Sequence, residues 1–225
     1  MTPPNAELLR SLGKLARGLS ALFWGLPASL IVCAETARIE LLTPIGIVPA
    51  FVVNLLLLFG LWQMSSFQKQ ERPWRNALDR AKLLGLVNLG LSPFLFWFSR
   101  MPEQPFFRGA IFVLILSAIL FLFNLNVVLK QLGAMLPDET LRQETGQFTA
   151  LNRWLLVLWV MFIGAAILAL NFDLQEHFDS NIWLWIERCA MAMLLFLGLS
   201  PLAITMALIW KTKEVIYDSV FGARR

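Results

Sequence analysis

The sequence predicts an all-α polytopic membrane protein with six transmembrane helices and both termini in the cytoplasm. The first observation is composition: 58% of the 225 residues are hydrophobic and 15% are charged, whereas soluble domains carry about 25% charged residues. The second is the gathering of the apolar residues into long runs. The third is the placing of the basic residues, most of which lie at alternate ends of these runs.

The clearest run extends from Pro44 to Met64 and contains 21 residues without a charge. At about 1.5 Å per residue, a helix of this length measures about 30 Å, the thickness of the hydrocarbon core of a bilayer. Positively charged loops favour the cytoplasmic side, so a basic segment after the run marks its inner end. That segment contains Lys69, Arg72, Arg75, Arg80 and Lys82.

Every other apolar run must alternate around this one. The predicted spans are about 19–34, 44–64, 83–99, 109–129, 154–171 and 189–210, with a cytoplasmic tail at 211–225. In this arrangement 15 of the 19 Lys and Arg residues lie inside, and the four outside are Arg38, Arg100, Arg108 and Arg188. This asymmetry predicts a multi-pass protein of the bacterial cytoplasmic (inner) membrane.

Two amphipathic segments are expected to form short interfacial helices on the inner surface of the membrane. Residues 1–18 place leucines at helical spacing between basic residues, and residues 73–82 show a similar apolar periodicity. An alternative for the N-terminal region is a cleaved signal peptide, with residues 32–34 as its cleavage site. Both interpretations of the first apolar run stay open.

No catalytic, cofactor-binding or metal-binding motif is found in the sequence. The two cysteines form neither a disulfide framework nor a metal-type spacing, and the basic residues flank apolar runs instead of forming a nucleic-acid-binding domain. The one histidine, His177, lies with Asp173, Glu176 and Asp179, where a solvated acidic loop is favoured over a metal site. We therefore expect no enzyme, no cofactor and no nucleic-acid partner.

The pattern Leu-Gly-Leu-Ser-Pro occurs twice, at residues 89–93 and 197–201, in the predicted third and sixth spans. Paired Gly and Pro interruptions are typical of transporter sites built from broken helices, but the same residues also bend membrane helices for packing. The candidate helix bends are Pro27, Pro93 and Pro201.

Four asparagines lie within the predicted spans, where a polar side chain needs a hydrogen-bond partner. Asn54, Asn88, Asn124 and Asn126 form a candidate intramembrane polar cluster. The favoured interpretation is hydrogen bonding between helices, with the last three bonding across spans three and four. The alternative is a polar lining for a substrate path.

The first and sixth spans carry matching residues at their outer ends. Cys33 and Glu35 end the first span, and Arg188 and Cys189 begin the sixth, so all four lie near one depth. A charge at the edge of the hydrocarbon gains more from a partner than one at an open surface. This predicts that the two spans are neighbours.

These features favour a structural or accessory subunit of a membrane complex, which docks other membrane or cytoplasmic proteins or organises the bilayer. No ionisable residue lies deep in a predicted span, which argues against a proton-coupled pump. The alternative is a small transporter, or a transporter substrate-binding subunit, with Gly/Pro-bent helices.

Overall fold

The structure, a computed structural model, describes residues 6–38, 45–68, 70–136, 139–171 and 180–221. These residues form helices and short turns, and no strand occurs among them. The helices are α1 (Ala6–Arg38), α2 (Val48–Met64), α3 (Arg72–Leu91), α4 (Pro93–Arg100), α5 (Pro105–Met135), α6 (Glu139–Asn171) and α7 (Ser180–Phe221). The all-helical prediction is confirmed for this part of the chain.

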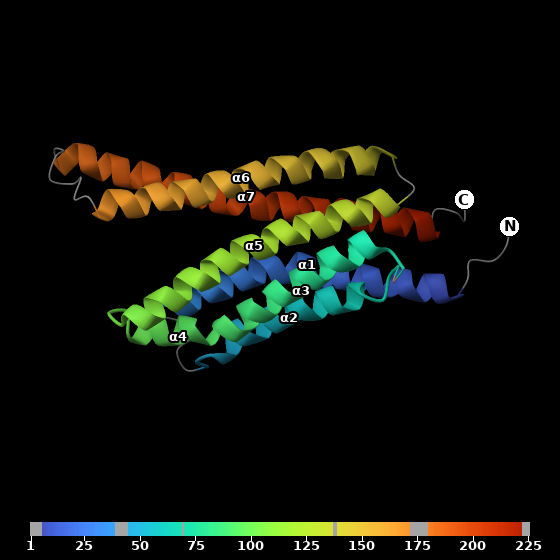
Figure 1. Cartoon of the computed structure of the whole chain (residues 1–225), viewed down its shortest axis with the longest axis horizontal. Helices are drawn as coiled ribbons and strands as arrows, with labels where there is room; N and C mark the ends of the chain where they lie inside the picture. The colour runs from blue at the N-terminus through green and yellow to red at the C-terminus, as the bar shows by residue number, and fades with distance from the viewer. Residues whose placement is uncertain (1–5, 39–44, 69, 137–138, 172–179, 222–225) are drawn as a thin grey trace.

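The helices run up and down along one long axis (Figure 1). α3 and α4 follow one another and together make a single traverse. α1 begins and α7 ends at the same end of the bundle, on the right in Figure 1, which is here called the near end. The turn between α2 and α3 lies there too. The opposite end is called the far end.

Among the described residues, five helical segments are long and apolar enough to cross a membrane. They are Arg10–Ala37, Arg72–Arg100, Pro105–Met135, Arg142–Ala165 and Arg188–Asp218. α2 is apolar but has 17 residues, about 25 Å at the α-helical rise. It begins later than the predicted span because Gly46 turns the chain with φ of 63° and Pro49 follows in the first helical turn.

The main apolar core lies between α1, α2, α3, α5 and the C-terminal half of α7. Trp74 is fully buried in it, and its indole Nε1 donates a hydrogen bond to the Phe67 carbonyl oxygen at 3.1 Å. This bond ties the turn between α2 and α3 to the core. The largest fully buried side chains are Trp74, Leu15, Leu19, Leu22, Leu61, Met64, Leu78, Leu125, Leu129, Leu132 and Leu208.

The expected interfacial helices are not separate elements. Residues 6–18 continue into the first span as α1, and residues 73–82 continue into the third as α3, because no proline stands at either join. Leu15 and Leu19 belong to the buried core on both sides of the first join. The amphipathic segments are thus the first turns of long helices.

Two other boundaries differ from the sequence-based expectation. α6 begins at Glu139, well before the predicted fifth span at 154–171, and passes Gly146 without a break. α7 extends beyond residue 210 to Phe221, so most of the expected tail is helical. Polar residues in both extensions keep helical backbone because they continue an already formed helix, for which each added residue contributes one hydrogen bond.

Candidate functional site

Asn54 lies on α2, apart from the other three asparagines of the predicted cluster. Its side-chain amide donates to the Ala50 carbonyl oxygen of its own helix at 2.8 Å, and it contacts Cys33 Sγ of α1 at 3.9 Å. Since the weak thiol contact is its one interhelical hydrogen bond among the described residues, Asn54 adds little to helix association.

The structure does not join the predicted asparagines to one another. Asn124 donates to the Leu120 carbonyl oxygen of its own helix at 2.9 Å, and the buried Oδ1 of Asn88 has no hydrogen-bond partner among the described residues. Asn126 does bond across helices, but to Thr205 of α7 at 2.9 Å.

Asn126, Asn152 and Thr205 form a buried contact between α5, α6 and α7, here called the polar junction. Asn152 donates its amide to Thr205 Oγ1 at 3.0 Å and to the Pro201 carbonyl oxygen at 3.2 Å. The Thr205 hydroxyl in turn donates to that same carbonyl at 2.7 Å. One hydroxyl therefore accepts two amides and uses its own proton, so its hydrogen-bonding capacity is filled.

Two acceptors of the polar junction stay free. Oδ1 of Asn126 and Oδ1 of Asn152 are buried without a hydrogen-bond partner among the described residues. A buried acceptor left unpaired costs about 1–3 kcal/mol. The polar junction therefore keeps two hydrogen-bond acceptors unused among the described residues.

Sequence reasoning missed Asn152 and Thr205. Asn152 lies just before the predicted fifth span at 154–171, next to Arg153, and so falls outside the predicted spans. Thr205 lies four residues after Pro201, so it stands one turn along the same helix face, where its hydroxyl reaches the Pro201 carbonyl. A Thr four residues after a Pro in an apolar run was the available signal.

The three candidate bends have different surroundings. Pro93 begins α4 after a break at Ser92, whereas Pro27 and Pro201 lie inside continuous helices. In both Leu-Gly-Leu-Ser-Pro patterns the serine hydroxyl donates to a carbonyl of its own helix, Ser92 to Leu89 at 2.8 Å and Ser200 to Phe196 at 2.7 Å. The repeated pattern thus supplies a local hydrogen bond beside each proline.

The predicted pairing of the first and sixth spans is found away from the cysteines. α1 and α7 pack together through Phe23 and Trp210, whose ring centroids are 5.6 Å apart. Cys33 instead contacts Asn54 and packs against an apolar cluster of α2, α4 and α5, while Cys189 is exposed. Both cysteines are free thiols.

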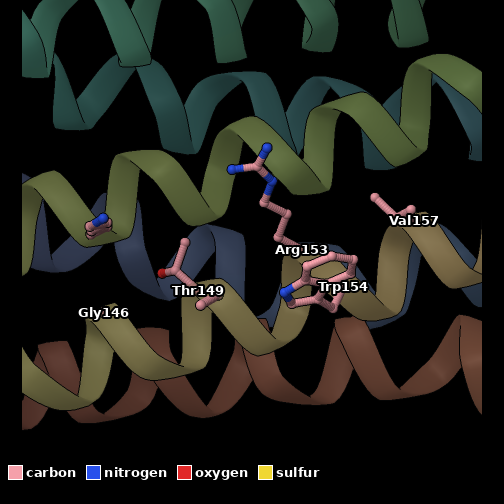
Figure 2. A pocket seen from close by; sticks show the side chains of 7 residues that line it. Gly146, Thr149, Arg153, Trp154 and Val157 are labelled. Carbon is pink, nitrogen blue, oxygen red and sulfur yellow. The ribbon is translucent and has the colours of Figure 1, made fainter.

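A pocket of about 420 Å³ lies between α5 and α6, here called the α5–α6 pocket (Figure 2). Figure 2 shows its α6 residues in order along the helix, with the Arg153 side chain extending towards α5. Gly146 leaves open space at one end, since no atom lies within 4 Å of where its Cβ would be. The pocket is lined by Lys130, Gly146, Thr149, Ala150, Arg153, Trp154 and Val157.

The α5–α6 pocket is basic. Its lining contains Lys130 and Arg153 and no carboxylate, and neither cation has an acidic partner within 4 Å among the described residues. The nearby Glu144 pairs with Lys211 of α7. The Arg153 guanidinium lies 5.9 Å from the centre of the Phe123 ring, a cation–π contact that limits its motion.

No group of His, Cys, Asp and Glu suited to a metal ion occurs among the residues that the structure describes. The acidic loop with His177, Asp173, Glu176 and Asp179 lies outside the described residues. Comparisons of the chain with known protein families, with curated proteins and with solved structures found no match.

Proposed function

We propose that this protein is a structural or accessory subunit of a membrane complex, with six transmembrane helices and both termini in the cytoplasm. The observation that carries the proposal is the closely packed apolar interior between α1, α2, α3 and α5. Interiors of this kind hold a fixed shape, which suits a protein that presents a surface to partners.

Close backbone contact in that interior joins α1 to α2. A Cβ atom on Gly18 would lie 2.6 Å from the Gly60 carbonyl oxygen, and one on Gly60 would lie 3.0 Å from the Gly18 carbonyl oxygen. Small residues that let two backbones approach in this way are typical of stable association between membrane helices. This contact supports a rigid scaffold.

The surface that we assign to a partner is on α6 and α7. In the structure α6 packs on α5 and α7, and its far-end half lies away from the core helices (Figure 1). Met161 of α6 and Phe196 of α7 are each 68% exposed. Exposed apolar side chains on this part of α6 and α7, away from the core helices, suit contact with a transmembrane helix of a partner protein.

The orientation rests on the basic residues. The first four residues of α3 include Arg72 and Arg75, and α3 starts at the near end, where α1 begins and α7 ends. The positive-inside bias would place this end in the cytoplasm. α2 is short for a span. It needs the residues of its adjoining turns, or a locally thin bilayer, to cross the membrane and bring the number of spans to six.

In-membrane photo-cross-linking tests the proposal. A photoreactive amino acid at Met161 or Phe196 in the tagged full-length chain should give a discrete product with a second protein. The matched control is Val52, which is 52% exposed on α2. Cross-links to lipid alone from all three positions would contradict the subunit proposal.

A small transporter is the second candidate, favoured by the free amide oxygens at the polar junction beside Pro201. In that case reconstituted protein should carry a polar solute across the liposome membrane. Thr205→Val should then reduce the flux by a larger factor than it reduces the amount of folded protein. Tritiated solute libraries on proteoliposomes, with empty liposomes as control, separate the two candidates.

A further inference from the structure

The lining of the α5–α6 pocket changes from polar to apolar along α6. Gly146, Thr149 and Arg153 come first, and Trp154 and Val157 follow. The α6 part of the lining spans about 16 Å, from the α-helical rise. A pocket with cations at one end and an apolar surface at the other has the polarity of a lipid molecule.

Its depth in the membrane agrees with that polarity. Lys130 directly follows the predicted fourth span, and Arg153 directly precedes the fifth. Trp154 is 73% exposed beside the pocket, and tryptophans gather at the level of lipid headgroups. The cations of the pocket therefore lie where the phosphates of one leaflet lie.

We propose that the α5–α6 pocket binds the phosphate headgroup of an anionic phospholipid. Arg153 offers two parallel N–H donors to phosphate oxygens, Lys130 adds a point charge from the facing helix, and the acyl chains follow Trp154 and Val157. The buried Thr149 hydroxyl has no hydrogen-bond partner among the described residues, and a phosphate oxygen supplies one. Assignment to the inner leaflet rests on the proposed orientation.

Native mass spectrometry of the delipidated full-length protein tests the site. Phosphatidylglycerol and phosphatidylcholine of equal chain length are added in detergent, and the retained lipids are counted. The wild type should retain phosphatidylglycerol in preference to phosphatidylcholine. Lys130→Gln with Arg153→Gln should lower phosphatidylglycerol affinity on the order of tenfold or more, because both charge-assisted contacts to the phosphate are lost.

Two further variants separate the pocket from general surface charge. Arg75→Gln with Arg80→Gln removes two exposed cations of α3, near the same end, and should leave the preference unchanged. Gly146→Leu keeps every charge and fills the open end of the pocket, so it should weaken phosphatidylglycerol retention. It also removes a helix glycine, which favours folding.

Competition with inorganic phosphate is the last experiment, because a free phosphate ion has the same chemistry as the lipid headgroup. Excess phosphate should displace little phosphatidylglycerol, since the apolar half of the pocket holds only a lipid. Full displacement by phosphate would overturn the lipid assignment in favour of a soluble anion. Equal retention of phosphatidylglycerol by the wild type and all three variants would overturn the site. These results do not depend on membrane orientation or on a protein partner.

Discussion

Asn152 of α6 donates its side-chain amide to the hydroxyl oxygen of Thr205 on α7, with 3.0 Å between the two atoms. Asn126 of α5 donates to the same oxygen, so a single hydroxyl joins three helices. Away from water, each of these amides has few other acceptors to choose from. Thr205 therefore links α7 to both α5 and α6 through hydrogen bonds.

Thr205→Val keeps the shape of the side chain and removes the shared acceptor of Asn126 and Asn152. We expect it to lower the free energy of unfolding in the membrane by roughly 1–3 kcal/mol, because two interhelical hydrogen bonds are lost. Steric-trapping unfolding in bicelles measures the change.

Asn124→Leu is the control for the polar junction. Asn124 bonds the Leu120 carbonyl of its own helix, so its loss should change the free energy of unfolding little. If Thr205→Val and Asn124→Leu are equally stable, the polar junction does not hold the three helices together.

Gly18→Ala tests the contact between α1 and α2. The added Cβ would meet the Gly60 carbonyl oxygen at 2.6 Å and Met64 Cγ at 2.8 Å. The backbone atom cannot move aside without separating the helices, so we expect a loss of roughly 1–3 kcal/mol, as for other overpacked sites. Thermal unfolding in detergent, followed by circular dichroism, measures it.

Gly13→Ala is the matched change on the same helix. No atom lies within 4 Å of the position of its Cβ, so alanine should be neutral or stabilise α1 by up to about 1 kcal/mol. A loss of stability equal to that of Gly18→Ala would show that the Gly18 contact is not special.

The helical class could be predicted from the sequence because crossing a bilayer needs long apolar runs, which are visible in composition. The fourth predicted span, 109–129, lies within α5. Helix ends were harder to predict, because the amphipathic segments next to the first and third spans have the same periodicity as the spans themselves. The continuity of α1 and α3 is consistent with the absence of a proline at either join.

The partners of the buried asparagines could not be predicted. Apolar runs give the height of a residue along the membrane normal, but not the rotation of its helix or the order of its neighbours. Asn88, Asn124 and Asn126 therefore share a predicted depth but share no hydrogen bond among the described residues. Cys33 and Cys189 likewise shared a depth, while α1 and α7 meet at Phe23 and Trp210.

The α5–α6 pocket left a signal that the sequence analysis did not use. Lys130 and Arg153 served only as markers of orientation. On α6 the small residues Gly146, Thr149 and Ala150 recur with Arg153 at spacings of three, one and three, which places them on one helix face. A helix face of small residues that ends in an arginine indicates room for a ligand. The α5 residues that line the pocket could be identified only from the structure.

The two cysteines should react at different rates in the folded protein. Cys189 is exposed, whereas Cys33 packs against a cluster that includes Ala50, Leu95 and Leu114. A maleimide should therefore modify Cys189 first in mild detergent and both residues after denaturation, as mapped by peptide mass spectrometry. A Cys33–Cys189 disulfide after mild oxidation would contradict the arrangement of α1 and α7.

Single-cysteine labelling tests the orientation. In a chain with Cys33→Ala and Cys189→Ala, Glu103→Cys should react with a membrane-impermeant maleimide in intact cells, because Glu103 is exposed at the predicted outer turn. Gln147→Cys should react only after permeabilisation, because it is exposed on α6 before the predicted fifth span. Thr145 is a poorer probe, since its side chain is buried. Labelling of Gln147→Cys but not Glu103→Cys in intact cells would place the basic end outside and reverse the proposed topology.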